Sequence, residues 1–168
     1  MTESRTIEKL TVNHDIQGFD CGQEDLNRWF WKHALPNQAA GSARTYVGRV
    51  GEAIVGFYSL AVGQIEYGDA PNRLRKGVAR HPVPVVLLAR LAVHKDWQRK
   101  GVGRALLRDA VLRTLQAAEA VGIRALLVHA KDEAAKQYYS QFDFMECGSD
   151  PLHLCALLKD LKGCFADT

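Results

Sequence analysis

A short glycine-containing segment is the part of the chain best suited to bind an anion. It follows an apolar stretch, residues 85–93, and precedes a segment with helical periodicity. Two glycines let the backbone turn without a Cβ atom, and the first turn of a following helix presents N–H groups with a partial positive charge. The same pattern also occurs in ordinary turns; here it predicts a diphosphate-binding loop, which we call the cradle. Its residues are Gln98, Arg99, Lys100, Gly101, Val102, Gly103 and Arg104.

Positive charge is concentrated around this loop. The 168 residues carry 22 Lys and Arg against 19 Asp and Glu, for a net charge of +3. Residues 72–108 alone hold ten basic residues and one acid, a local charge of +9, and the rest of the chain sums to −6. Four of the cations precede the apolar stretch in a loop rich in proline and glycine, where they form either a solvated surface or a nucleic-acid contact. They are Arg73, Arg75, Lys76 and Arg80.

Hydrophobic periodicity predicts the elements that position these groups. Strands are expected over 6–12, 43–50, 53–62, 85–93, 123–130, 142–147 and 153–158, and helices over 23–34, 102–121 and from a cap at Asp132 to about Gln141. A turn and helix cap are expected at Asp20, Cys21 and Gly22, and a hairpin turn at Gly51. This order predicts an α/β (α+β) fold, with a mixed central sheet and helices on both faces.

Composition is typical of a soluble globular protein. The chain is 47% hydrophobic and 24% charged, no apolar run reaches membrane-spanning length, and the first residues lead into no apolar signal segment. We therefore expect a cytoplasmic protein. The four cysteines show no Cys-x-x-Cys spacing, so buried or idle thiols are expected and no metal site.

The cradle is similar to the acyl-CoA loop of the GNAT N-acetyltransferases, Gln/Arg-x-x-Gly-x-Gly/Ala, and the order of elements is also that of this family. The resemblance covers nearly the whole chain and implies one GNAT domain over residues 1–168. It implies the GNAT acyl-CoA N-acyltransferase fold, in which the strand before the cradle splays from its neighbour. The cradle would hold the pyrophosphate of acetyl-CoA, and the backbone of Leu91, Ala92 and Val93 would pair with the pantetheine amides.

A second motif of the same family lies downstream. Asp132, Ala135, Tyr139, Asp143 and Phe144 match Asn-x-x-Ala-x-x-x-Tyr-x-x-x-Gly-Phe, with Asp in place of Asn and of Gly. Asp tolerates the left-handed conformation expected where the family has glycine. The resemblance places the tyrosine near the sulfur of acyl-CoA, where a phenol can give a proton or hydrogen bond to the departing thiolate. We therefore predict Tyr139 as the general acid, although it could also be a packing aromatic.

The predicted strand before the cradle lacks a carboxylate that could act as a base. The substrate that accepts the acetyl group should therefore be an amine that loses its proton easily. A lysine side chain has a pKa of about 10.4, whereas an α-amine is near 8 and an ester lowers it further, so an aminoacyl ester suits the site. The candidates for the base are His94, His129 and water.

Several blocks narrow the resemblance to the GNAT toxins of bacterial type II toxin-antitoxin pairs. They include Phe-Asp-Cys-Gly at 19–22, Ala-Arg-Thr-Tyr-Val at 43–47 and Leu-Ala-Arg-Leu-Ala-Val at 88–93. Such toxins acetylate the α-amine of aminoacyl-tRNA and so inhibit translation, and a ribbon-helix-helix antitoxin neutralises them; a homodimer is also expected. The tRNA contacts would be Arg44, Arg73, Arg75, Lys76, Arg80 and Arg90, although Arg90 could instead belong to a buried ion pair.

Two other functions fit the same residues. One is a GNAT enzyme that acetylates a small amine or a protein N-terminus, because enzymes of one fold can act on many different acceptor substrates. The other is a non-enzymatic acyl-CoA-binding module whose basic loop docks a partner. The intact glycines and Tyr139 disfavour the second.

Overall fold

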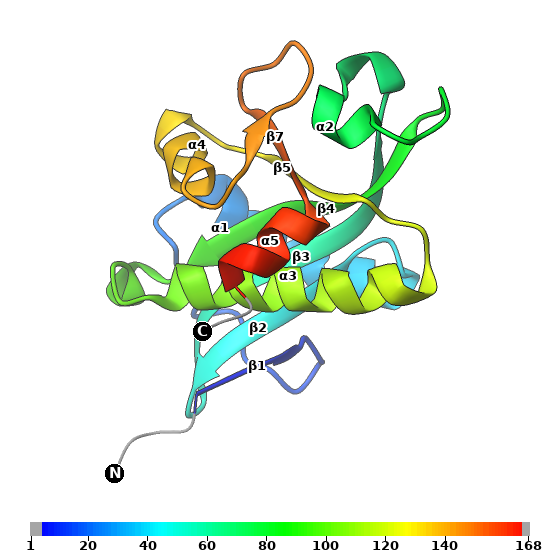
Figure 1. Cartoon of the computed structure of the whole chain (residues 1–168). Helices are drawn as coiled ribbons and strands as arrows, with labels where there is room; N and C mark the ends of the chain where they lie inside the picture. Colours follow the sequence, from blue (N-terminus) through cyan, green and yellow to red (C-terminus); the bar gives the residue numbers. More distant parts are fainter. Residues whose placement is uncertain (1–4, 166–168) are drawn as a thin grey trace. The chain divides into compact units, whose positions relative to one another are not determined.

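The computed structural model describes residues 5–165, which cluster into two compact units. The first unit comprises residues 5–61 and 89–110, and the second comprises residues 62–88 and 111–165. The described strands form a mixed sheet in the order β1-β2-β3-β4-β5-β7-β6. Strands β3 and β4 and helix α3 contribute residues to both units (Figure 1).

The elements follow one another along the chain with short connections. They are β1 (Arg5–Lys9), α1 (Glu24–Ala40), β2 (Arg44–Val50), β3 (Ala53–Ile65), the 3-10 helix η1 (Tyr67–Asp69), α2 (Asn72–Arg75), β4 (Val83–Val93), the 3-10 helix η2 (Lys95–Trp97), α3 (Val102–Ala120), β5 (Ala125–His129), α4 (Glu133–Ser140), β6 (Met145–Glu146), β7 (His153–Leu157) and α5 (Leu158–Phe165).

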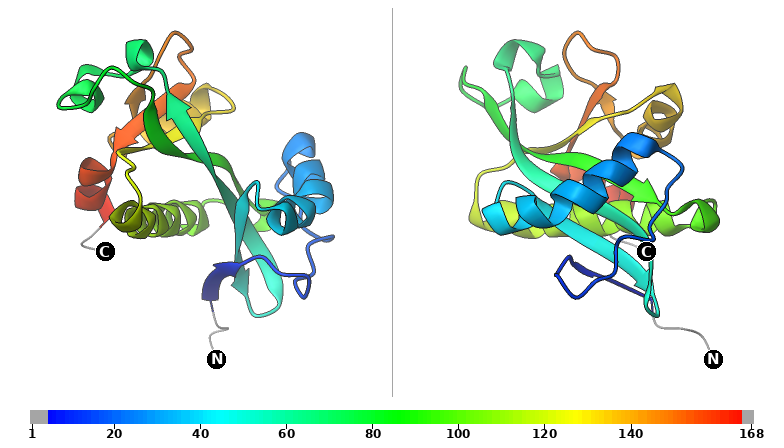
Figure 2. Two further views of the ribbon diagram at one scale, coloured as in Figure 1. Left: turned by 90° about the vertical axis from the view of Figure 1, so that its right-hand side faces the viewer. Right: turned by 180° about the vertical axis from the view of Figure 1, so that it is seen from behind.

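In the first unit, an aromatic core joins α1 to one face of an antiparallel sheet. β2 pairs with β1 and β3, and α1 lies on one face of β2 and β3 while the first turns of α3 lie on the other (Figure 2). On the α1 face, Phe30 stacks on Phe57 with ring centroids 4.1 Å apart, and Phe19 meets both rings edge-on. All three side chains are buried, so this face excludes water.

Two glycines let α3 approach the opposite face of the same strands. Gly48 and Gly56 are cross-strand partners in β2 and β3. A Cβ atom on Gly56 would lie 2.7 Å from Cδ1 of Leu106 and 3.0 Å from the carbonyl oxygen of Ala92. An added Cβ atom would force the Leu106 side chain or the Ala92 carbonyl to shift, so glycine here favours the close approach of α3 to the sheet.

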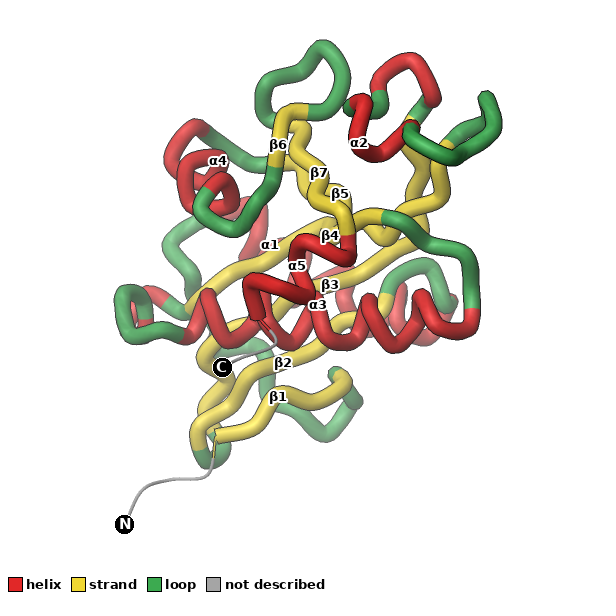
Figure 3. The backbone as a smooth tube through the Cα atoms, in the orientation of Figure 1, coloured by secondary structure: helices red, strands yellow, loops and turns green. Residues whose placement is uncertain are grey.

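In the second unit, β4 pairs in parallel with β5, and β7 pairs antiparallel with β5 and β6. The register of β4 and β5 runs from Val85 opposite Ala125 to Leu88 opposite Val128, so residues 89–93 of β4 lie beyond it. Figure 3 shows β6 as a short strand between loops. A separate buried cluster forms here, with Leu74, Val85, Leu127, Cys155 and Leu157 among its members.

The structure confirms the predicted order of strands and main helices and corrects several boundaries. β1 ends at Lys9, α1 continues past Pro36 to Ala40, and β6 has only two residues. The predicted loop before β4 contains η1 and α2, and α5 was not predicted. The expected cap at Asp20 to Gly22 is wrong, because the N-cap of α1 is Gln23, which makes no side-chain cap bond.

Other local predictions are confirmed. Gly22 adopts a φ of 86°, as a turn requires, and Asp143 adopts a φ of 66°, in the left-handed region. Asp132 caps α4, because its Oδ1 accepts a hydrogen bond from the N–H of Ala135 at 2.8 Å. Among the described helices, none combines the length and apolar character that a membrane crossing needs.

Replacing Gly56 with alanine should destabilise the protein by about 1–3 kcal/mol, because the added Cβ overpacks the contact with Leu106. Gly48→Ala is the matched control, since its Cβ would meet Leu106 at an ordinary 3.5 Å. The control should change the free energy of unfolding by less than about 1 kcal/mol. Urea denaturation of both variants measures the difference, and equal stability of the two would contradict the close approach.

Candidate active site

The cradle is built by two left-handed residues that lead into α3. Arg99 has a φ of 61° and Gly101 a φ of 84°, and the N–H of Ala105 bonds the carbonyl of Gly101 at 3.1 Å as the helix begins. A left-handed conformation at a residue other than glycine costs about 1–2 kcal/mol, so the surroundings must impose it on Arg99. The N–H groups of the first turn of α3 point away from the helix and, with the neighbouring cations, suit a diphosphate.

The side chain of Gln98 holds the cradle to the protein. Its Nε2 donates to the carbonyl oxygens of Cys21 and Val93, each at 3.1 Å. The amide therefore connects the end of β4 to the segment before α1. Its contribution to the cradle is to fix the loop, since its donors are directed at backbone carbonyls.

Asp20 holds Lys95, just before the cradle, through contacts that the sequence did not reveal. Its Oδ1 accepts hydrogen bonds from the N–H of Gly22 at 2.8 Å and from Nδ2 of Asn27 at 2.9 Å, and its Oδ2 lies 3.2 Å from Nζ of Lys95. These donors, the Gly22 N–H first, lower the pKa of Asp20 to about 2. The backbone N–H of Lys95 also bonds the carbonyl of Asp20 at 2.8 Å.

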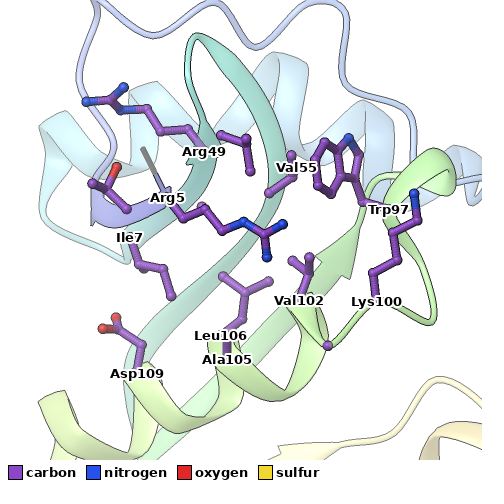
Figure 4. Close-up of a pocket in the computed structure, with 14 residues that line it drawn as sticks. Arg5, Ile7, Arg49, Val55, Trp97, Lys100, Val102, Ala105, Leu106 and Asp109 are labelled. Atoms are coloured by element: carbon purple, nitrogen blue, oxygen red, sulfur yellow. The ribbon is translucent and has the colours of Figure 1, made fainter. Parts of the chain in front are cut away.

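A cavity of about 350 Å³ lies beside the cradle, between β1, β2 and the start of α3 (Figure 4). Trp97 forms one wall, with Nζ of Lys100 5.3 Å and Cζ of Arg5 6.0 Å from its ring centroid. Val102 and Leu106 contribute apolar surface. The side chain of Lys100 therefore faces an aromatic ring in this cavity.

Tyr139 is a buried phenol on α4. It is 7% exposed, and its ring packs edge-on against Phe144 at 5.5 Å and against Tyr138 at 5.6 Å. Burial raises the pKa of Tyr139 well above its ordinary value, because the charged phenolate is desolvated. The residue is therefore protonated throughout the physiological range, which is the state that a hydrogen-bond donor needs.

The two candidate histidine bases have different environments. Nδ1 of His94 accepts a hydrogen bond from the N–H of Asp96 at 3.1 Å, which places the proton of the neutral ring on Nε2 and leaves no ring nitrogen to accept another. His129 stacks on His153 with ring centroids 3.9 Å apart. Burial, and then the proximity of His153, lower the pKa of His129, so its ring is neutral near pH 7.

Arg90 lies in the first unit, over the face of Trp29. Its Cζ is 4.1 Å from the ring centroid, and burial lowers the pKa of the guanidinium. Among the residues that the structure describes, no carboxylate pairs with it, so the alternative of a buried ion pair is not found. Arg44 donates from Nη1 to the carbonyl of Gln38 at 2.9 Å, near the end of α1.

The predicted site residues divide between the two units. The first unit contains the cradle, Arg44, Arg90 and Leu91 to Val93, and it also contains Asp20. The second unit contains the capped start of α4, Tyr139 and the basic β3–β4 connection, with Arg73, Arg75, Lys76 and Arg80. Within residues 5–165, no group of three or more His, Cys, Asp or Glu side chains could hold a metal ion. Three of the cysteines, Cys21, Cys147 and Cys155, are buried, as predicted.

Comparison with known proteins gives consistent matches. Residues 41–146 match the acetyltransferase (GNAT) domain. The chain is 43% identical over 159 residues to the tRNA-acetylating toxin of Mycobacterium tuberculosis, covering 95% of each protein. It is 29% identical to AtaT in complex with acetyl-methionyl-tRNAfMet, with a TM-score of 0.89 and coverage of 96% of this chain and 99% of the other. A tyrosine-to-phenylalanine mutant of AtaT bound to acetyl-CoA and the C-terminus of the antitoxin AtaR is 28% identical, with a TM-score of 0.82, covering 97% and 99%.

The buried phenol of Tyr139 should make stability depend on alkaline pH. An unfolded tyrosine ionises with a pKa near 10, whereas Tyr139 in the folded chain keeps its proton at higher pH. The contribution of the buried Tyr139 side chain to the free energy of unfolding is therefore complete below pH 10 and is lost as the pH rises above it. The free energy of unfolding should fall by up to about 1.4 kcal/mol per pH unit above 10. Urea denaturation between pH 9 and 11 measures the slope. The slope should become shallower in Tyr139→Phe than in wild type; equal slopes in the two proteins would refute the effect.

Proposed function

The chain belongs to the GNAT acetyltransferase family, and from this membership we propose that it transfers the acetyl group of acetyl-CoA to the α-amine of an aminoacyl-tRNA. Acetylation of that amine prevents its use in peptide-bond formation, so the proposed role is that of a toxin that inhibits translation. The proposed partner is a ribbon-helix-helix antitoxin, and the proposed site of action is the cytoplasm, where charged tRNA is found.

One observation carries this proposal: the likeness to a tRNA-acetylating toxin extends over 95% of both chains at 43% identity. The structural likeness to AtaT, solved with acetyl-methionyl-tRNAfMet, likewise covers almost the whole chain. A fold alone would leave the acceptor open, because GNAT proteins share one architecture. The match extends well beyond the acyl-CoA motif, because it spans 159 residues of the chain.

In the proposed reaction, the cradle binds acetyl-CoA through its diphosphate. The left-handed turn at Arg99 and Gly101 directs backbone N–H groups at the start of α3 toward the phosphate oxygens. Gln98 and Asp20 hold this loop in place before the ligand arrives, so little ordering remains to be done on binding. The backbone of Leu91 to Val93, beyond the part of β4 that pairs with β5, is the proposed contact of the pantetheine amides.

The chemical step joins the amine nitrogen to the acetyl carbon and breaks the bond from that carbon to sulfur. The amine loses one proton, and the CoA sulfur gains one, so the reaction is balanced without a further reactant. Tyr139, protonated at neutral pH, is the proposed donor of a proton or hydrogen bond to the departing thiolate. β4 contains no carboxylate, which fits an acceptor that loses its proton readily. Of the two histidines, His129 is the better candidate for the base, because its lowered pKa keeps the ring neutral.

The proposed tRNA contacts are cations of both units. Arg90 and Arg44 belong to the first unit, and Arg75, Lys76 and Arg80 belong to the second. Arg90 is the most distinctive, because a desolvated guanidinium without a carboxylate partner among the described residues favours an external anion. The homodimer and the single-domain organisation of residues 1–168 stay predictions; light scattering of the purified protein measures the first.

Tyr139→Phe should abolish acetyl transfer while acetyl-CoA binding is retained, because the substitution removes only the hydroxyl group. The measurement incubates purified protein with labelled acetyl-CoA and charged or uncharged tRNA, and follows label in the aminoacyl group. Wild-type protein should label charged tRNA only, and Tyr139→Phe should lower the rate at least about 100-fold.

Tyr138→Phe is the matched control, since it removes the neighbouring hydroxyl on the same helix and should retain most of the activity. Full turnover by Tyr139→Phe would exclude Tyr139 from the mechanism. If wild-type protein binds acetyl-CoA but labels no RNA, the acceptor is instead a small amine or a protein N-terminus.

A further inference from the structure

The four cations of the β3–β4 connection have different surroundings, and Arg73 is already engaged. Its Nη1 lies 2.6 Å from Oδ2 of Asp160, and its Nη2 donates to Oδ1 of the same carboxylate at 3.0 Å. These bonds raise the pKa of Arg73. Its charge is therefore balanced within the protein, where the pair connects α2 to α5. An external anion would have to compete with a two-point contact for this side chain.

Arg75 and Arg80 instead converge on one aromatic ring. The Cζ atoms of Arg75 and Arg80 lie 5.5 Å and 6.0 Å from the ring centroid of Tyr67. Arg75 is held further by a hydrogen bond from its Nη2 to Oδ1 of Asn72 at 2.7 Å. Within residues 5–165, neither guanidinium is paired with a carboxylate. Two like charges thus share one neutral partner.

An aromatic ring can hold two cations near each other without neutralising them. The attraction of a guanidinium to the ring face offsets part of the repulsion between the two charges. A guanidinium held in this way keeps most of its five N–H donors for another ligand, and their planar arrangement matches the oxygens of a phosphate. The cluster is therefore organised to receive anionic oxygens.

We propose that Tyr67 positions Arg75 and Arg80 as a paired binding site for phosphate groups of RNA. This inference rests on the proposed function, which makes tRNA the acceptor substrate. One carboxylate would satisfy one guanidinium, whereas consecutive phosphates of an RNA strand present the repeated charge that two convergent guanidiniums match. Lys76 follows directly in the chain and adds a third cation. Tyr67 is a positioning residue and carries no charge itself.

The test compares the affinity of wild type and variants for uncharged tRNA, by fluorescence anisotropy over a series of salt concentrations. Tyr67→Leu leaves the net charge unchanged but removes the ring, and should weaken binding about three- to tenfold. The slope of log affinity against log salt concentration should decrease in magnitude by about 0.7–1.8, which is the change expected for the loss of one or two phosphate contacts. Tyr67→Phe, which keeps the ring, should bind as wild type does.

A double variant with unchanged net charge tests whether the neighbouring ion pair contributes to tRNA binding. Arg73→Gln combined with Asp160→Asn removes one charge of each sign and should retain wild-type tRNA affinity, whereas Arg75→Gln with Arg80→Gln should lose at least as much as Tyr67→Leu. Acetyl-CoA affinity, expected to be unchanged in every variant, reports that each has folded.

Unchanged tRNA affinity in Tyr67→Leu, or an equal loss in the Arg73 and Asp160 variant, would overturn the inference. In either case, label transfer to charged tRNA by wild-type protein would leave the proposed function standing. If wild-type protein neither binds tRNA nor labels it, the proposed function fails and the inference fails with it.

Discussion

The close approach of α3 to β3 at Gly56 is the contact on which the candidate site depends. The cradle ends where α3 begins, so the position of its N–H groups is set by how closely the helix lies on the sheet. Glycine at position 56 brings the helix within contact distance, and Leu106 and Val102 fill the space that a side chain would take. The need for a residue without a Cβ atom at position 56 in β3 thus affects the geometry of the cradle, which is distant in sequence.

Attachments from the segment before α1 complete this arrangement. Asp20 and Cys21 contact Lys95 and Gln98 through an ion pair and hydrogen bonds. The N-terminal part of the first unit therefore has a role beyond packing, because it fixes the connection between β4 and the cradle. The same network gives a structural role to the Phe-Asp-Cys-Gly block at residues 19–22, since its aspartate pairs with Lys95 and its cysteine carbonyl accepts from Gln98.

Features that depend on neighbouring residues could be predicted from the sequence, whereas contacts between residues far apart in the chain could not. The apolar run of β4, the periodicity of α3 and the cap at Asp132 each rest on neighbouring residues, and the structure contains all three. The α5 helix was missed because residues 158–165 follow a strand with no cap or turn signal between them. The cradle could be recognised because its glycines, Gly101 and Gly103, lie only two positions apart in the sequence. The Arg73–Asp160 pair could not, since 87 positions separate its members.

The burial of Tyr139 bears on where the proton of the product thiol originates. A thiol has an ordinary pKa near 8.5, far below that of a phenol raised by desolvation, so complete transfer from Tyr139 to the thiolate would be uphill by about 1.4 kcal/mol for each unit of difference. In the proposed reaction, the phenol therefore stabilises the thiolate by hydrogen bonding and releases its own proton only as another replaces it. That replacement is available from the attacking amine, which must lose a proton to become an amide. Tyr139 would then act as a relay between nitrogen and sulfur, and its protonation state would be the same before and after each turnover.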